Sequence, residues 1–184
     1  YIFGATFEKG AYGTSYIPNH GTSGGVTRAA DSCSVTGASD VIGQTEGTMF
    51  IDFVWNALTG VGSYPRVIEL WGDSNNYIQT FTISGSELLY WEILSGGVNQ
   101  FSGSTSMSLG HNKIAVSYKT NDAVIYKNGT LLASDSSVSV PATNAIGLTG
   151  SYAGGGAQLS ASVKQAILFN ERLTNAELAT LTTL

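Results

Sequence analysis

Hydrophobic and polar residues alternate with a period of two along much of this chain, a pattern typical of β-strands that bury one face. Segment 47–56 shows it most clearly, because Met49, Ile51, Phe53 and Trp55 fall on a single face. This face is predicted to point into a core. The same pattern predicts further strands at 66–71, 77–83, 87–94, 113–119, 123–127, 130–133, 145–149 and 159–169, and one or two within 26–35.

Turn residues between these segments predict antiparallel pairing. Asn128 and Gly129 stand between 123–127 and 130–133, and both residue types accept the positive φ angles of a two-residue type I′ hairpin turn. Together with 113–119, the two segments are therefore predicted to form three consecutive antiparallel strands.

The only helix signal lies near the C-terminus. Thr174 and Glu177 have the spacing of a capping box, and Leu173 and Leu178 are placed to form a hydrophobic staple across it. The pattern predicts a helix of about two turns. Its expected role is structural, with Leu178 and Leu181 packed against the strands.

Composition limits the class of protein. With 184 residues, 42% of them hydrophobic and 11% charged, the chain suits one folded β-rich domain and not a disordered segment. No apolar run approaches the roughly 20 residues that cross a bilayer, so membrane insertion is not expected. The net charge of −5, with eight scattered basic residues, excludes a phosphate-binding surface for nucleic acid. The single cysteine, Cys33, excludes an intrachain disulfide and is predicted to be a buried thiol.

Three regions carry a resemblance to known proteins: a hairpin at 115–129, the passage 7–31 and the passage 169–178. Residues 115–118 (AVSY), Asp122 and 126–129 (YKNG) resemble the central hairpin of concanavalin-A-like and laminin-G-like jelly rolls. More narrowly, the chain resembles the C-terminal jelly roll of tailed-phage tail and fibre proteins. That likeness rests on residues 7–18 (FEKGAYGTSYIP), 26–31 (VTRAAD) and 169–178 (FNERLTNAEL).

The resemblance implies an all-β fold, an antiparallel jelly-roll β-sandwich with one short C-terminal helix. Residues 1–25 would be an N-terminal strand and glycine-rich linker from an upstream domain, packed on the sandwich, and residues 26–184 the jelly-roll domain itself. The implied function is a noncatalytic recognition domain at the surface of a phage particle. Its partners would be a host cell-surface glycan and other virion proteins, and by analogy the fibre would be a homotrimer.

Two other functions are compatible with the residues. One is an architectural virion module that decorates or assembles the particle, binds another virion protein and binds no sugar. Its mark would be an exposed apolar patch. The other is a carbohydrate-binding module of a secreted bacterial protein.

Catalysis is not expected. Retaining glycosidases need two carboxyl groups about 5 Å apart, which sandwich enzymes supply from alternate positions of one strand. Segment 47–56 offers only Asp52, and Glu87 and Glu92 are five residues apart and so point to opposite faces. The two histidines, His20 and His111, lack the spacing of a zinc site or an oriented base.

Sugar-binding sites combine flat aromatic rings with side chains that bind hydroxyl groups. The densest such cluster is formed by Trp71, Asp73, Asn75, Asn76 and Tyr77. The alternative is equally concrete: this is ordinary hairpin composition, and Trp71 packs beneath the turn.

Secondary candidates lie on another strand and in a loop. If Leu89, Trp91 and Ile93 face the core, Tyr90 and Glu92 line the outer, concave face of the sheet. Tyr152, in a glycine-rich loop, is a further candidate. Calcium is a secondary expectation, and its ligands would come from Asp73, Asn75 and Asp122.

Overall fold

The computed structural model describes residues 33–58, 62–152 and 158–184, which belong to one compact unit, Ser32–Leu184. The described residues form two antiparallel sheets and one helix. The six-stranded sheet has the order β1 (Cys33–Thr36), β10 (Ala145–Leu148), β3 (Arg66–Asp73), β4 (Asn76–Thr82), β5 (Leu88–Ser95) and β6 (Val98–Ser106). The five-stranded sheet has the order β11 (Ala161–Phe169), β2 (Glu46–Trp55), β7 (Gly110–Lys119), β8 (Asp122–Lys127) and β9 (Thr130–Asp135). The predicted all-β jelly-roll sandwich is confirmed.

The core lies between the two sheets and is built mainly by alternate residues of the strands. On β2, Met49, Ile51, Phe53 and Trp55 are at most 1% exposed, as their shared face predicts. The inward residues of β5, among them Leu89, belong to the same cluster. Each side chain of this size contributes about 1.5–3 kcal/mol by leaving water, so alternation fixes which face of each strand points inward.

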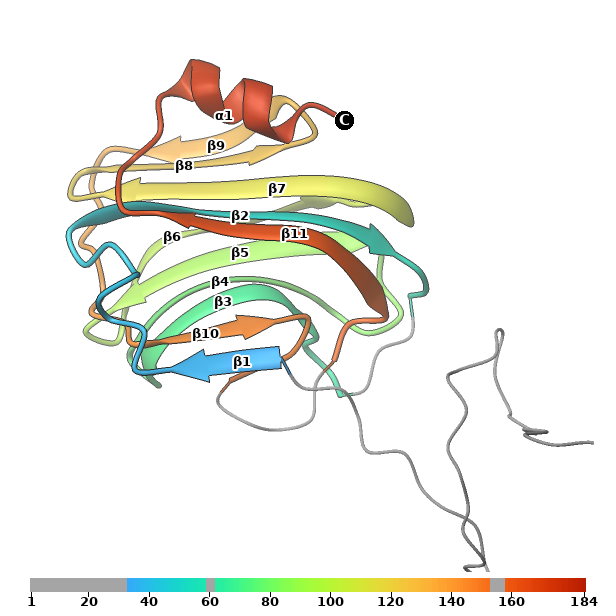
Figure 1. Ribbon diagram of the computed structural model, residues 1–184, viewed down its shortest axis with the longest axis horizontal. Helices are drawn as coiled ribbons and strands as arrows, with labels where there is room; N and C mark the ends of the chain where they lie inside the picture. The colour runs from blue at the N-terminus through green and yellow to red at the C-terminus, as the bar shows by residue number, and fades with distance from the viewer. Residues whose placement is uncertain (1–32, 59–61, 153–157) are drawn as a thin grey trace, which may run out of the picture. The chain divides into compact units, whose positions relative to one another are not determined.

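The helix α1 (Asn175–Thr182) covers the outer face of the five-stranded sheet, beside β8 and β9 (Figure 1). The Thr174 side chain accepts a hydrogen bond from Glu177 N at 3.3 Å, and Glu177 Oε2 accepts one from Thr174 N at 2.8 Å. The Thr174 hydroxyl also donates to Glu177 Oε2 at 2.7 Å. The hydrogen bonds that the carboxylate accepts, first from the Thr174 side chain and then from its backbone, hold the pKa of Glu177 below its ordinary value. The predicted capping box is confirmed.

The predicted staple is also present. Leu173 and Leu178 share a buried cluster with Phe50, Ala115 and Tyr126 from the sheet. The staple and the cap together fix the angle at which the chain enters the helix. As a result α1 closes this outer face, whereas the outer face of the six-stranded sheet bears no helix from the described part of the chain.

Two details of the sequence-based expectation need correction. Cys33 is exposed and not buried, because β1 is a four-residue edge strand that pairs only with β10 and whose residues are all exposed. β6 was not predicted, because its outward positions are serines and only Phe101 and Gly103 mark its inward face.

The predicted hairpin turn is confirmed, since φ is 49° at Asn128 and 82° at Gly129. The predicted linker 1–25, the domain boundary at Val26 and His20 lie outside the described residues. No helix among the described residues is long and apolar enough to cross a membrane.

Candidate ligand-binding surface

The open face of the six-stranded sheet carries three rows of side chains, of which two cross β3, β4 and β5 and the third joins β3 and β4. Register places Arg66, Phe81 and Tyr90 in the first row, Glu69, Gln79 and Glu92 in the second, and Trp71 and Tyr77 in the third. We call these eight residues the β3–β5 face. They point outward because the residues that alternate with them, such as Leu70, Ile78 and Trp91, lie in the core.

The first row is an aromatic stack with a cation at one end. The rings of Phe81 and Tyr90 are 5.2 Å apart between centroids and inclined by 15°. The Arg66 guanidinium carbon lies 5.2 Å from the centroid of the Phe81 ring, and Tyr64 meets the same ring edge-on at 6.1 Å. These contacts are favourable aromatic and cation–π geometries, so they hold the row in place.

The third row is a second aromatic stack. The Trp71 and Tyr77 rings are parallel within 3°, with centroids 5.5 Å apart. Both residues are half-buried, so neither is hidden beneath the turn. The β3–β5 face thus has aromatic surface at two places, with polar side chains between them.

The middle row centres on the Glu92 carboxylate. Its Oε2 accepts hydrogen bonds from Tyr77 Oη at 3.1 Å and Gln79 Nε2 at 2.9 Å, and its Oε1 accepts one from Asn99 Nδ2 at 3.1 Å. Burial, and then the negative charge of Glu92, raises the pKa of Tyr77 to about 12, so this phenol remains a proton donor at neutral pH. The three donors fix the carboxylate in the plane of the row.

Gln79 is only 4% exposed, yet its Oε1 atom has no hydrogen-bond partner among the described residues. Because Glu92 can only accept, the Gln79 amide nitrogen must face it, and the amide oxygen is directed elsewhere. An unpaired buried acceptor costs about 1–3 kcal/mol, so this atom is an unsatisfied polar group within the face.

Glu69 closes the other end of the row. Its side chain is fully buried, Oε2 accepts a hydrogen bond from Tyr152 N at 2.7 Å, and Oε1 lies 3.4 Å from Arg66 Nε. Gly147 of β10 makes room for this contact, because a Cβ there would lie 3.3 Å from Glu69 Oε2 and 2.8 Å from the Gly150 carbonyl oxygen. Glu69 therefore ties the loop at Tyr152 to the β3–β5 face.

The polar residues of the predicted Trp71–Tyr77 cluster make turn contacts. Asp73 Oδ1 accepts hydrogen bonds from Asn75 N at 2.7 Å and Asn76 Nδ2 at 3.0 Å. Asn76 Oδ1 accepts a hydrogen bond from Gly96 N at 2.9 Å, and the Asn75 carbonyl accepts one from Gly97 N at 2.9 Å. The side chains of Asp73 and Asn76 and the backbone of Asn75 hold the β3–β4 and β5–β6 turns together, as the hairpin alternative predicts. Contact of these residues with a ligand stays a prediction.

The weak calcium candidates are not brought together. Asp122 pairs with Arg172, whose Nη2 donates to Oδ1 at 2.9 Å and whose Nε lies 2.9 Å from Oδ2 as an ion-pair contact outside hydrogen-bond geometry. Asp122 belongs to β8 of the five-stranded sheet, whereas Asp73 and Asn75 lie at the β3–β4 turn of the other sheet. No group of three or more acidic, histidine or cysteine side chains suited to a metal ion is found among the described residues.

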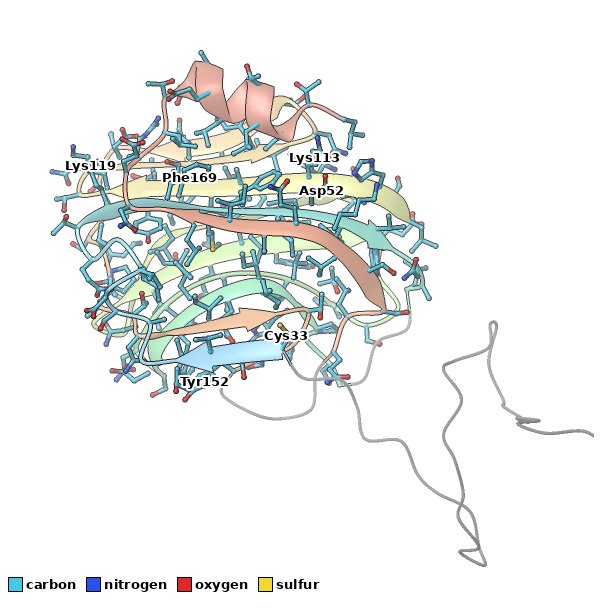
Figure 2. The ribbon with its side chains drawn as sticks, viewed as in Figure 1. Cys33, Asp52, Lys113, Lys119, Tyr152 and Phe169 are labelled. Atoms are coloured by element: carbon cyan, nitrogen blue, oxygen red, sulfur yellow. The ribbon has the colours of Figure 1, made fainter. Side chains whose placement is uncertain are left out.

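His111 lies on the five-stranded sheet, away from the β3–β5 face. Its Nε2 is 2.7 Å from Asp52 Oδ1 and 3.4 Å from Lys164 Nζ, and Lys113 Nζ is 3.9 Å from the other Asp52 oxygen. Figure 2 shows Asp52 and Lys113 side by side, well apart from Tyr152. The four side chains form an ion-pair cluster that crosses β11, β2 and β7.

Sequence reasoning identified half of the β3–β5 face. Tyr90 and Glu92 lie on the outer face because Leu89, Trp91 and Ile93 are buried, as predicted. The residues missed were Arg66, Glu69, Gln79 and Phe81. A signal for two of them existed, since Gln79 and Phe81 continue the period of two from Tyr77.

The comparisons with known proteins relate to the fold. No protein-family model matches the chain, and no curated protein sequence matches it. Among solved structures, the CBM40 domain of Ruminococcus gnavus IT-sialidase bound to α2,3-sialyllactose superposes with a TM-score of 0.63 at 11% identity, covering 83% of this chain and 97% of that one.

Two sialidases contain a similar region. The NanB sialidase of Streptococcus pneumoniae matches with a TM-score of 0.63 at 17% identity over 82% of this chain, and the leech intramolecular trans-sialidase with 0.58 at 13% over 81%. This chain spans 26% of the first enzyme and 27% of the second. At these identities the likeness establishes the fold alone: the chain contains a jelly-roll β-sandwich domain.

Proposed function

We propose that the chain is a noncatalytic carbohydrate-binding domain and that the β3–β5 face is its binding site. The observation that carries the proposal is one open sheet face on which two aromatic stacks border a polar row with an unpaired buried acceptor at Gln79. Sugar rings present apolar C–H faces that pack on aromatic side chains, while their hydroxyl groups bond with amides and carboxylates. Both kinds of group lie side by side here.

The fold comparison supports this class of function without fixing it. The CBM40 domain is similar along almost its whole length, and its structure contains a bound glycan. A carbohydrate-binding module therefore fits the structural neighbours better than a phage fibre domain. The phage setting, the virion location and the homotrimer rest on the sequence resemblance and stay predictions; a binding face on one sheet would serve either setting.

The test is a glycan array probed with the domain tetramerised on streptavidin, because single lectin sites are weak and several linked copies raise the apparent affinity by 10²–10⁴. Trp71→Ala removes one stack, and Phe169→Ala is the matched control, a half-buried aromatic on the other sheet. Binding should fall about tenfold or more in the first variant and stay unchanged in the second. Equal binding by both variants would reject this face, and repeating the screen without calcium tests the metal expectation.

A second candidate function is favoured by a specific observation. A pocket of about 490 Å³ lies between α1 and the end of β11, lined mainly by Phe169, Leu173, Ala176 and Leu181. An apolar recess is the mark expected of an architectural module that binds another protein. If no glycan binds and Phe169→Ala abolishes incorporation into a parent assembly, this alternative replaces the first.

A further inference from the structure

We infer that the glycan bound on the β3–β5 face carries no negative charge on the residue that contacts Gln79 and Glu92. This inference rests on the proposed function and deepens it by naming the class of ligand. It separates this chain from its CBM40 neighbour, whose bound glycan, a sialyllactose, is acidic. Four observations on the sheet support it.

The first observation is the charge of the six-stranded sheet. Its strands carry three carboxylates, Glu69, Asp73 and Glu92, and a single cationic side chain, Arg66. The other described basic residues lie on strands of the five-stranded sheet or, for Arg172, in the segment before α1. The face on which a sugar would lie therefore has a negative balance.

The second observation is that Arg66 is already engaged. Nε lies 3.4 Å from Glu69 Oε1, Nη1 donates to the Tyr64 carbonyl at 2.8 Å, and the guanidinium plane rests on Phe81. Glu69 is fully buried, and an uncompensated buried carboxylate is costly. Drawing Arg66 toward a ligand carboxylate would leave Glu69 without its cation, so the described strands of this sheet offer no uncommitted positive charge to an acidic sugar.

The third observation is the kind of hydrogen-bonding group presented. Gln79 Oε1 is a buried acceptor without a donor among the described residues. Within the same residues, Glu92 Oε1 accepts only from Asn99 Nδ2 and keeps one acceptor site, whereas Glu92 Oε2 already accepts two hydrogen bonds. The amide nitrogen of Gln79 and the hydroxyl of Tyr77 both point at Glu92 and are used there. The middle row therefore needs donors from its ligand. Sugar hydroxyls are donors, whereas an ionised carboxylate is only an acceptor.

The fourth observation is the short distance between a ligand group at Gln79 and the Glu92 carboxylate. Gln79 and Glu92 are direct cross-strand partners, so a ligand group bonded to Gln79 lies about 5 Å from the Glu92 side chain. Two like charges at that separation, at an effective dielectric between protein surface and water, disfavour binding by roughly fivefold to a hundredfold or more. An acidic sugar would meet this repulsion, and a neutral sugar would not.

The experiment compares related neutral and acidic glycans. Lactose is paired with 3′-sialyllactose, and methyl-esterified polygalacturonate with polygalacturonate, which differs from it only in the free carboxylates; each glycan is immobilised at equal density and probed with the tetramerised domain. The expected result is at least tenfold stronger binding to the neutral member of any pair that binds. The preference should shrink between 0.05 and 1 M NaCl, since the Debye length falls from more than 10 Å to about 3 Å.

Two variants test whether the middle row, through Glu92, causes the preference for neutral glycans. Glu92→Gln removes the charge that faces the ligand, whereas Glu171→Gln makes the same change at an exposed position in the segment between β11 and α1. Glu92→Gln should bring the neutral-to-acidic ratio within about threefold of unity, and Glu171→Gln should leave it at the wild-type value. Urea midpoints of both variants show whether the fold is retained, and Glu92→Asp is the second variant, with the charge kept, if Glu92→Gln fails to fold.

The outcomes distinguish failure of the inference about charge from failure of the proposed carbohydrate-binding function. Binding to acidic glycans as strong as, or stronger than, binding to neutral ones overturns the inference and leaves the carbohydrate-binding function standing. An unchanged ratio in Glu92→Gln also overturns it, because the discrimination would then arise elsewhere. Binding to neither member of any pair, with correctly folded protein, rejects the proposed function itself and the inference with it.

Discussion

Gly103→Ala tests whether the core beneath the β3–β5 face is packed as the structure describes. Gly103 of β6 pairs with Trp91 of β5, and a Cβ at this position would lie 2.3 Å from Trp91 Cζ2 and 2.9 Å from Cε2 and Cη2. Ordinary carbon contacts are about 3.5–4.0 Å, so the indole must withdraw by more than about 1 Å. It has little room, because Trp91 is 5% exposed and packs against Phe101.

Overpacking of this kind costs about 1–3 kcal/mol, and replacing glycine in a compatible backbone returns about 0.4–1 kcal/mol through the unfolded chain. We expect Gly103→Ala to lower the free energy of unfolding by about 1–2 kcal/mol net, measured from the urea midpoint at unchanged m-value. Ser102→Ala is the control, because Ser102 is exposed on the same strand.

A double-mutant cycle sharpens the test. Trp91→Phe removes the ring atoms that the new methyl group would meet, so Gly103→Ala should be neutral or stabilising in that background, with a coupling free energy of about 1–2 kcal/mol. The same cost in both backgrounds, or a stabilised single variant, would refute the packing described here. Because Glu92 follows Trp91 and pairs with Ser102, the single variant should also weaken glycan binding.

Three further predictions concern the fold and its pH dependence. Leu178→Ala should lower the free energy of unfolding by about 2–5 kcal/mol, since Leu178 is fully buried; a loss below 1 kcal/mol would contradict the staple. Thr174→Ala should cost about 0.5–2 kcal/mol and speed amide exchange in α1; unchanged exchange would contradict the cap. Burial, with Glu92, raises the pKa of Tyr77 to about 12, and burial raises that of Tyr118 further. Because the unfolded phenols ionise first, stability should fall as pH rises above 10, and Phe at both positions should flatten the fall seen in urea melts.

The period of two was enough to predict which way most strands face. It could not predict which residues become neighbours across the sheet, because that depends on register. Register on β3 shifts twice, between Arg66 and Ile68 and between Trp71 and Asp73, and each shift changes the partner by one position. The first shift interrupts the alternation, because the consecutive residues Val67 and Ile68 both lie in the core. Two neighbouring apolar residues do not by themselves show where a bulge falls or which residue on β4 pairs with Arg66.

The exposure of individual polar and small residues could not be predicted from the sequence either. Glu69 stands in an apolar strand and reads as an outward residue, yet contacts from Arg66 and Tyr152 bury it completely. Cys33 is the reverse case, a small residue in a strand that proves exposed because its strand lies at the edge. In both cases tertiary neighbours, and not the local pattern, decide the exposure of the side chain.

The two outer faces of the sandwich meet different demands, and this difference explains where a ligand can bind. On the five-stranded sheet, Phe50, Ala115 and Tyr126 face outward and are apolar or aromatic, so the chain returns as α1 to cover them. On the six-stranded sheet the outward residues bond and stack with one another across strands, which lets the face stand without a helix. One acceptor, Gln79 Oε1, is left over by this self-pairing. The proposed function places the ligand on this face, because no helix of the described chain covers it.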